Sequence, residues 1–503
     1  GLAGAGASSG MAMAHWEIQG WMILILGWVF VPFYTRSMVY TMPEFLERRY
    51  NPQSRTILSV ISLVSYVLTK VAVTVYAGGL VFQQVFGIKE LWGIDFFWIA
   101  AIGLVVLTAL YTIFGGMKSV LYTSVLQTPI LLLGSLIILV LGFKELGGWD
   151  EMMRVCGAVT VNDYGDTMTN LIRSNDDANF PWLGALIGSA IIGFWYWCTD
   201  QFIVQRVLSG KNEMEARRGT IFGAYLKLLP VFLFLIPGMI AFALHQKYIG
   251  AGGEGFLPML ANGTANADAA FPTLVAKLLP AGVKGLVVCG ILAALMSSLA
   301  SLFNSSAMLF TIDFYKRFKP ETPEKKLVGI GQIATIVIVV LGILWIPIMR
   351  SVGDVLYTYL QDVQSVLAPG IAAAFLLGIC WKRTSAQGGM WGLISGMVIG
   401  LTRLGAKVYY SNAGEVADST FKYLFYDMNW LFFCGWMFLF CIIVVIVVSL
   451  ATEAPTAEKI QGLVFGTATK EQKAATRASW NHWDIIHTVI ILAITAAFYW
   501  YFW

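Results

Sequence analysis

The sequence has 503 residues, of which 58% are hydrophobic and only 12% are charged. A soluble domain has about 25% charged residues, so this chain has too few to cover a water-facing surface of its size. The formal net charge of +4 gives no support to nucleic acid as a partner. Continuous apolar blocks about 20 residues long indicate a polytopic, all-α membrane protein and exclude a barrel of alternating strands.

In chain order, a glycine-rich half-segment (1–14) is expected to precede twelve full spans. The spans cover residues 17–34, 56–86, 95–115, 119–143, 182–205, 219–245, 279–314, 327–349, 355–380, 388–410, 429–450 and 484–503. We interpret residues 1–503 as one transmembrane domain with a core over 1–380 and peripheral helices over 388–503. The polar segment 451–483 is expected to be cytoplasmic, with a helix on the surface.

Basic residues gather on alternate loops, which fixes the expected orientation. They lie within 36–55, at 118, and within 206–218, 316–326 and 382–383. Loops rich in Lys and Arg stay on the cytoplasmic side. The opposite loops are short, which favours a bacterial inner membrane. The cysteines fall mostly in apolar blocks and show no zinc or disulfide pattern.

Ionisable residues within the predicted spans are informative because a charge is costly there, and we single out Glu17, Lys70, Asp200 and Lys227. One interpretation is that they form structural ion pairs, or that their head groups reach the membrane interface. The other is that they line a polar cavity near the middle of the membrane. The residues themselves leave both interpretations open.

Further polar and aromatic residues favour the cavity. Tyr357, Gln361 and Gln364 recur at i, i+4 and i+7, so they share a helix face. The aromatic cluster Phe194–Trp197 lies well inside a span, away from the interface where aromatic belts occur. Sugars have apolar faces that stack on rings and hydroxyls that need donors and acceptors, and these residue types provide both.

A serine-rich face is a candidate cation site. Ser297, Ser301 and Asn304 share one face, with Ser298 and Ser305 beside it. Serines in membrane helices often only pack closely and bond to their own backbone. Hydroxyl and carbonyl oxygens are also the ligands that a hard cation prefers.

At these residues the chain resembles the sodium/glucose cotransporter family of solute:sodium symporters. The motifs that carry the resemblance are residues 1–6, 40–50, 111–116, 195–206, 225–227, 294–301, 310–315 and 375–383. Their number, order and spacing make the signal strong, although no single motif decides it.

The resemblance implies a LeuT-type inverted-repeat fold with additional peripheral helices, with sugar and sodium bound near mid-membrane at broken helices. It also implies that residues 1–14 are the second half of the first core helix. One whole helix and half of the broken helix would then lie upstream.

The resemblance also assigns site residues. The expected sugar-binding residues are Glu17, Trp16, Tyr196, Trp197, Lys227, Tyr357 and Gln361. Ala294, Ser297 and Ser298 match half of the main sodium site. Three positions depart from the family pattern. Gly193 replaces a sugar-binding Asn of some bacterial members, and Ser124 and Ala300 replace the Asp and Thr of a second sodium site.

The sequence therefore predicts a symporter that imports a neutral hexose, glucose or galactose, with one sodium ion per sugar, by alternating access between the two sides of the membrane. Its expected partners are sugar, sodium and the lipid bilayer, without nucleic acid. The alternatives are a symporter of the same fold for myo-inositol or sialic acid, and a sugar sensor or channel-like protein. The four histidines form no cluster and no phosphate loop or nucleophile motif is present, so the sequence does not indicate an enzyme.

Overall fold

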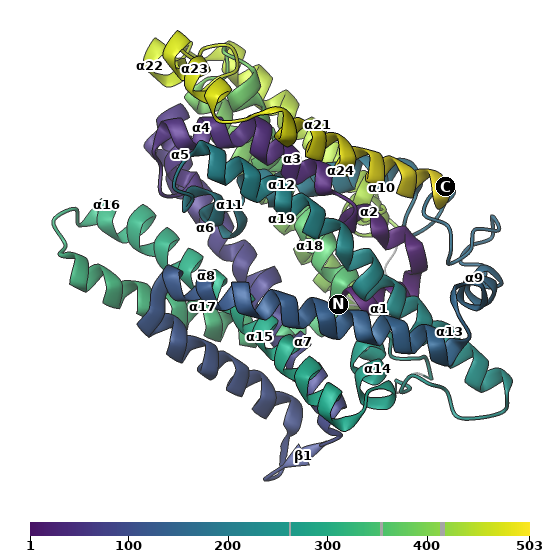
Figure 1. The fold of residues 1–503 in the computed structure, drawn as a ribbon. Coiled ribbons are helices and arrows are strands. Elements are labelled where there is room, and N and C mark those ends of the chain that lie inside the picture. The colour runs from purple at the N-terminus through teal and green to yellow at the C-terminus, as the bar shows by residue number, and fades with distance from the viewer. Residues whose placement is uncertain (261–262, 353–355, 413–417) are drawn as a thin grey trace.

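A computed structural model describes residues 1–260, 263–352, 356–412 and 418–503, which form a bundle of helices (Figure 1). The first helices are α1 (Leu2–Ser9), α2 (Ala14–Glu17), α3 (Gly20–Ile25), α4 (Val31–Ser37), α5 (Met42–Arg49), α6 (Pro52–Ser65), α7 (Ala72–Phe86) and α8 (Phe96–Leu146). The middle helices are α9 (Trp149–Gly157), α10 (Trp182–Gly193), α11 (Gln201–Leu208), α12 (Glu213–Pro230), α13 (Ile236–Gly250), α14 (Ala270–Leu278), α15 (Ala281–Met308), α16 (Lys316–Phe318) and α17 (Glu324–Val352).

The last helices are α18 (Leu356–Cys380), α19 (Ala386–Asn412), α20 (Thr420–Lys422), α21 (Trp430–Ala451), α22 (Ala457–Ile460), α23 (Lys470–Ala478) and α24 (His482–Tyr501). Two short 3-10 helices are η1 (Gly10–Met13) and η6 (Ala267–Ala269). A two-stranded antiparallel pair, β1 (Glu90–Leu91) and β2 (Ile94–Asp95), lies at the end of the molecule away from α22 and α23 (Figure 1).

Within the described residues, ten helices are long and apolar enough to cross a membrane. They correspond to ten of the twelve predicted spans. The other two are helical as well: 388–410 lies in α19, and 95–115 falls in the first half of α8. Residue 355, the expected start of another span, lies outside the described residues. The surface helix expected in 451–483 is present as α23, which begins with a capping box between Thr469 and Gln472.

Capping residues explain where several helices begin. Asn51 accepts a hydrogen bond from the Ser54 amide, and a proline occupies the first position of α6. Asn212 accepts one from the Glu215 amide at the start of α12. Asn is a preferred N-cap because its short side chain satisfies an amide that has no partner within the helix.

Three predicted boundaries are wrong. Residues 95–115 and 119–143 form one 51-residue helix, α8, which changes direction along its length in Figure 1. The span expected over 182–205 is interrupted at Asp200, whose extended backbone (φ −79°, ψ 127°) separates α10 and its π-helical end, η4 (Phe194–Thr199), from α11. Glu17 does not begin a span: it ends α2, and a break at Ile18 and Gln19 precedes α3.

Further π-helical turns continue other helices: η2 (Leu26–Phe30), η3 (Tyr66–Val71), η5 (Val231–Leu235), η7 (Leu309–Tyr315) and η8 (Tyr423–Asp427). Such turns are rare, and they occur often at functional sites because they redirect side chains and leave backbone groups without regular partners. Of all the π-helical turns, η3 and the previously described η4 carry residues of the polar interior described below.

Two helices meet backbone to backbone at glycines. A Cβ placed on Gly370 of α18 would lie 2.9 Å from the Cα of Gly396 and 3.0 Å from the carbonyl oxygen of Gly392, both on α19. Small residues allow this close approach between membrane helices. The C-terminal helix α24 packs along α3 and α12 (Figure 1).

Candidate substrate-binding site

The centre of the site is the carboxylate of Glu17, at the end of α2. Lys227 on α12 donates from Nζ to Oε2 at 2.5 Å, and the Tyr357 hydroxyl on α18 donates to Oε1. Glu17 is only 6% exposed. A buried carboxylate is tolerated when it is paired and hydrogen-bonded, so these partners explain how Glu17 remains inside the bundle. Three residues predicted to bind sugar are thus in direct contact.

A cavity of about 200 Å³ lies beside this carboxylate. Its lining residues are Trp16, Glu17, Gln19, Ile192, Gly193, Tyr196, Trp197, Lys227, Tyr357, Leu360, Gln361 and Gln364. All seven residues predicted to bind sugar are among them. The volume is below the roughly 300–1,000 Å³ of sites for drug-sized ligands, so the cavity suits a small solute.

Two polar atoms of the lining are buried without a hydrogen-bond partner among the residues that the structure describes. They are Oε1 of Gln361, which can only accept a hydrogen bond, and Nε1 of Trp16, which can only donate one. A buried polar group without a partner costs about 1–3 kcal/mol. A hydroxyl both donates and accepts, so a solute that carries several hydroxyls could satisfy both atoms.

Aromatic rings form another part of the wall. Tyr196 and Trp197 lie on η4, with ring centroids 5.1 Å apart and ring planes at 80°. Nζ of Lys227 lies 5.3 Å from the centroid of Trp197. The aromatic cluster therefore contributes to the cavity, as predicted, and Trp197 lies directly against the Glu17–Lys227 pair.

Lys70 and Asp200, the other two ionisable residues singled out in the sequence, form a separate ion pair. Lys70 on η3 donates to Oδ2 of Asp200, and the Tyr66 hydroxyl donates to Oδ1 at 2.9 Å. Asp200 also caps α11 by accepting a hydrogen bond from the Phe202 amide at 3.2 Å. For Lys70 and Asp200 the interpretation as a structural ion pair is thus correct.

The predicted sodium residues lie on α15 and differ in exposure. Ser297 is buried, and its Oγ lies 2.6 Å from Oγ of Ser124 on α8. Ser298 is exposed and Ala294 is half-buried. One turn after Ser297, Ser301 donates to the Ser297 carbonyl at 2.9 Å and accepts a hydrogen bond from Nη2 of Arg206 at 2.7 Å.

Sequence reasoning left two amides out of the predicted binding set. Gln364 shares the helix face of Tyr357 and Gln361, and this spacing was the available signal. Gln19 gave a weaker signal, its position two residues after Glu17. It is 2% exposed and donates from Nε2 to the Ser189 carbonyl at 2.9 Å.

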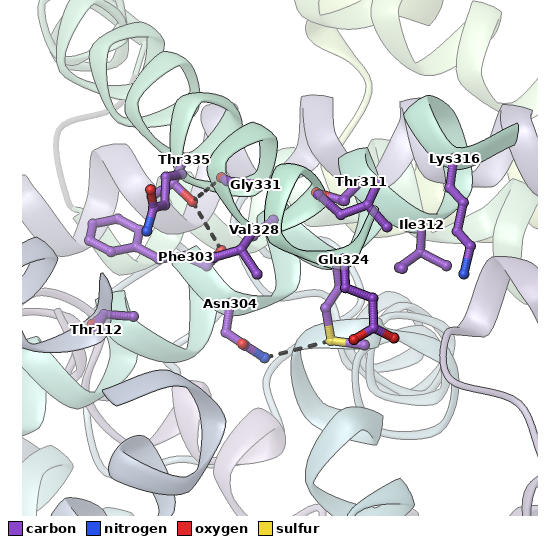
Figure 2. Close-up of a pocket in the computed structure, with 14 residues that line it drawn as sticks. Thr112, Phe303, Asn304, Thr311, Ile312, Lys316, Glu324, Val328, Gly331 and Thr335 are labelled. Carbon is purple, nitrogen blue, oxygen red and sulfur yellow. Dashed lines mark hydrogen bonds between the residues drawn. The ribbon is translucent and has the colours of Figure 1, made fainter. Parts of the chain in front are cut away.

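A second cavity, of about 470 Å³, lies between α15, η7 and α17 and contains none of the predicted binding residues (Figure 2). The Thr335 hydroxyl donates to the carbonyls of Gly331 and Phe303, at 3.0 and 3.3 Å. Nδ2 of Asn304 donates to Oε1 of Gln205 on α11 at 3.1 Å and points to the sulfur of Met308, 3.7 Å away. These polar groups bond within their own helices or to neighbouring helices, and the cavity contains none of the predicted binding residues, so we assign it no substrate role.

Comparisons with known proteins agree with this geometry. A family model described as "Sodium:solute symporter family" matches residues 1–396. Sodium/myo-inositol cotransporter 2 of Homo sapiens is 35% identical over 480 residues, 93% of this chain and 70% of that protein. Sodium/glucose cotransporter 1 of Ovis aries is 37% identical over 471 residues, which cover 90% of this chain and 70% of that protein.

One solved structure shares the fold. It is an outward-open, substrate-bound state of a sodium-coupled sialic acid symporter, with a TM-score of 0.69 and 21% identity, covering 90% of this chain and 86% of that one.

Proposed function

The chain belongs to the sodium:solute symporter family, and from that premise we propose that it imports a neutral hexose, glucose or galactose, together with sodium. Its fold is the all-α, LeuT-type membrane fold expected from the sequence, and it is a sodium-coupled transporter rather than an enzyme. In such a transporter, sodium shifts the population towards the state that binds solute, so the two binding equilibria are coupled.

The charge balance of the small cavity carries the proposal for a neutral sugar. Its two charged residues, Glu17 and Lys227, neutralise each other at 2.5 Å. The remaining polar lining is made of amides, a tyrosine pair and indoles, which suit hydroxyls and the apolar faces of a ring. An anion would face the Glu17 carboxylate without an unpaired cation in the lining, which argues against sialic acid.

A cyclic polyol is the second candidate, because sodium/myo-inositol cotransporter 2 of Homo sapiens is 35% identical to this chain. Myo-inositol presents hydroxyls around a ring as a hexose does, so the same donors and acceptors would serve either solute. The two candidates differ in which hydroxyls meet which side chains.

We also propose one sodium ion per sugar. Ala294, Ser297 and Ser298 would contribute to its site. A second site would need the residues at 124 and 300, but Ser124 bonds to Ser297 and Ala300 has no oxygen in its side chain. Arg206 donates to the adjacent Ser301, so a fixed positive charge lies beside this face. A second cation would meet repulsion in a region of low dielectric constant.

Uptake into sealed vesicles tests the function. Purified protein in proteoliposomes should accumulate labelled D-glucose, D-galactose or myo-inositol only under an inward sodium gradient. Accumulation of myo-inositol alone would select the second candidate. Uptake that only equilibrates the solute, with or without sodium, would show a channel-like protein and contradict the proposal.

A further inference from the structure

Gln19 and Gly193 both line the small cavity and lie next to each other in its wall. Gly193 is the last residue of α10, with φ −62° and ψ −41°, a conformation that any residue adopts. The backbone therefore does not require glycine here. A Cβ on residue 193 would, however, overlap Oε1 of Gln19 and lie 3.0 Å from its Cδ.

The orientation of the Gln19 amide follows from its partner. The Ser189 carbonyl can only accept, so the group 2.9 Å from it must be the NH2 of Gln19. This bond fixes Nε2 against α10 and turns Oε1 towards Gly193 and the cavity. Gln19 is also held at its backbone, because it lies at the break between α2 and α3, two residues after Glu17.

We propose that Gln19 is a specificity-determining residue that accepts a hydrogen bond from one hydroxyl of the sugar. The missing side chain of Gly193 leaves the space that the Gln19 amide occupies. This inference rests on the proposed function. The amide oxygen of Gln19 occupies the space that any side chain at 193 would take. It adds a fixed acceptor on the wall formed by α10, whereas Gln361 presents its acceptor from α18.

A double-mutant cycle in proteoliposomes tests the pairing, with labelled D-glucose and myo-inositol as probes. Gln19→Ala removes the acceptor, and Gly193→Ala displaces it. Each should raise the half-saturating concentration of the transported probe by about tenfold, the effect of one lost hydrogen bond of about 1.4 kcal/mol, with little change in the maximal rate. In Gln19→Ala the added methyl no longer meets the amide, and its nearest remaining neighbour, Cγ of the flexible Met22 side chain at 3.3 Å, needs to move only slightly. The double variant should therefore match Gln19→Ala alone.

A matched control is Gly329→Ala on α17, where an added Cβ meets nothing within 4 Å. It should leave the half-saturating concentration unchanged. Additive effects of Gln19→Ala and Gly193→Ala, or an unchanged affinity in either single variant, would overturn the pairing. Thermal unfolding of each purified variant checks that it is folded.

Deoxy sugars test for direct contact. If D-glucose is the transported probe, the 1-, 2-, 3-, 4- and 6-deoxy derivatives are used as competitors of its uptake. One derivative, lacking the contacted hydroxyl, should compete equally well in the parent and in Gln19→Ala, while the other four weaken by the same factor as D-glucose. An equal loss for all five would show that Gln19 acts only through packing, which overturns the proposal. D-galactose serves as the probe of the cycle where it alone is transported. Absence of uptake of all three solutes by the parent overturns the proposed function and this inference together.

Discussion

Lys70 and Asp200 form an ion pair inside the bundle, although they lie 130 residues apart in the sequence. Nζ of Lys70 also lies within 5 Å of three ring centroids, those of Tyr66, Tyr196 and Phe202, at 4.8, 4.9 and 4.2 Å. Because Tyr196 lines the small cavity and Asp200 begins α11, this ion pair connects the wall of the site to the interruption between α10 and α11.

Removing one partner of this pair should destabilise the protein. Lys70→Met leaves Asp200 buried without its counter-charge, and breaking a buried pair costs about 3–5 kcal/mol. We expect a clearly lower Tm in detergent, measured by intrinsic fluorescence. Arg154→Ala is the control, because its pair with Glu151 is exposed and such pairs contribute about 0–1 kcal/mol. Equal Tm values for Lys70→Met and the parent would show that the pair contributes little to stability.

Substitutions at the small cavity should abolish or strongly weaken sugar binding without unfolding the protein. Gln361→Ala removes Oε1, an acceptor with no hydrogen-bond partner among the described residues, so no protein hydrogen bond to this atom is lost when the sugar is absent. Glu17→Ala removes the carboxylate and leaves the largely buried Lys227 without its counter-charge, so the Tm of this variant is measured beside sugar binding and is expected to fall. Binding of labelled D-glucose or myo-inositol to purified protein measures both effects. The control is Gln332→Ala, at the separate cavity between α15 and α17. Unchanged affinity in either site variant would contradict the assignment.

Substitution of a proposed sodium ligand should change how uptake depends on the sodium concentration. Ser298→Ala should raise the sodium concentration for half-maximal uptake much more than it lowers uptake at saturating sodium, because it removes a ligand oxygen. Ser305→Ala is the matched control: its hydroxyl is buried and bonds to the Ser301 carbonyl at 3.0 Å. Identical sodium curves for the parent and Ser298→Ala would mean that this exposed serine has no part in the site.

The stoichiometry predicts how far sugar accumulates. Each charge moved across 100 mV contributes about 2.3 kcal/mol. With equal sodium on both sides and 100 mV negative inside, one sodium per sugar should therefore concentrate sugar by at most about 50-fold, and two by at most about 2,500-fold. The final ratio of labelled sugar in proteoliposomes under a potassium diffusion potential measures this limit. A ratio well above 50-fold, or a sigmoidal sodium dependence, would show that a second sodium ion moves.

Much of the fold and of the candidate site could be predicted from the sequence. The apolar blocks located the spans because a membrane demands about 20 apolar residues per crossing. Periodicity placed Tyr357, Gln361 and Gln364 on one face, and the structure confirms that all three line one cavity. The grouping of the other sugar-binding candidates came from the family resemblance, and the comparisons confirm that family.

Other features could not be predicted, because they depend on contacts between distant segments. Apolar residues continue on both sides of Asp200, so only the partners of its carboxylate, Tyr66 and Lys70, reveal why the helix is interrupted there. Gln19 follows no periodic pattern. Its role depends on the missing side chain of Gly193, 174 positions later in the chain.

The contact between Gly370 and Gly396 limits how the bundle can move. Where two backbones touch, neither helix can slide or turn about its own axis without driving larger neighbouring residues into the other. Helix α18, which carries Tyr357 and Gln361, therefore takes α19 with it when it tilts. The side of α18 that lines the small cavity is thus one edge of a two-helix unit with α19, so a tilt of α18 at the cavity would move both helices together.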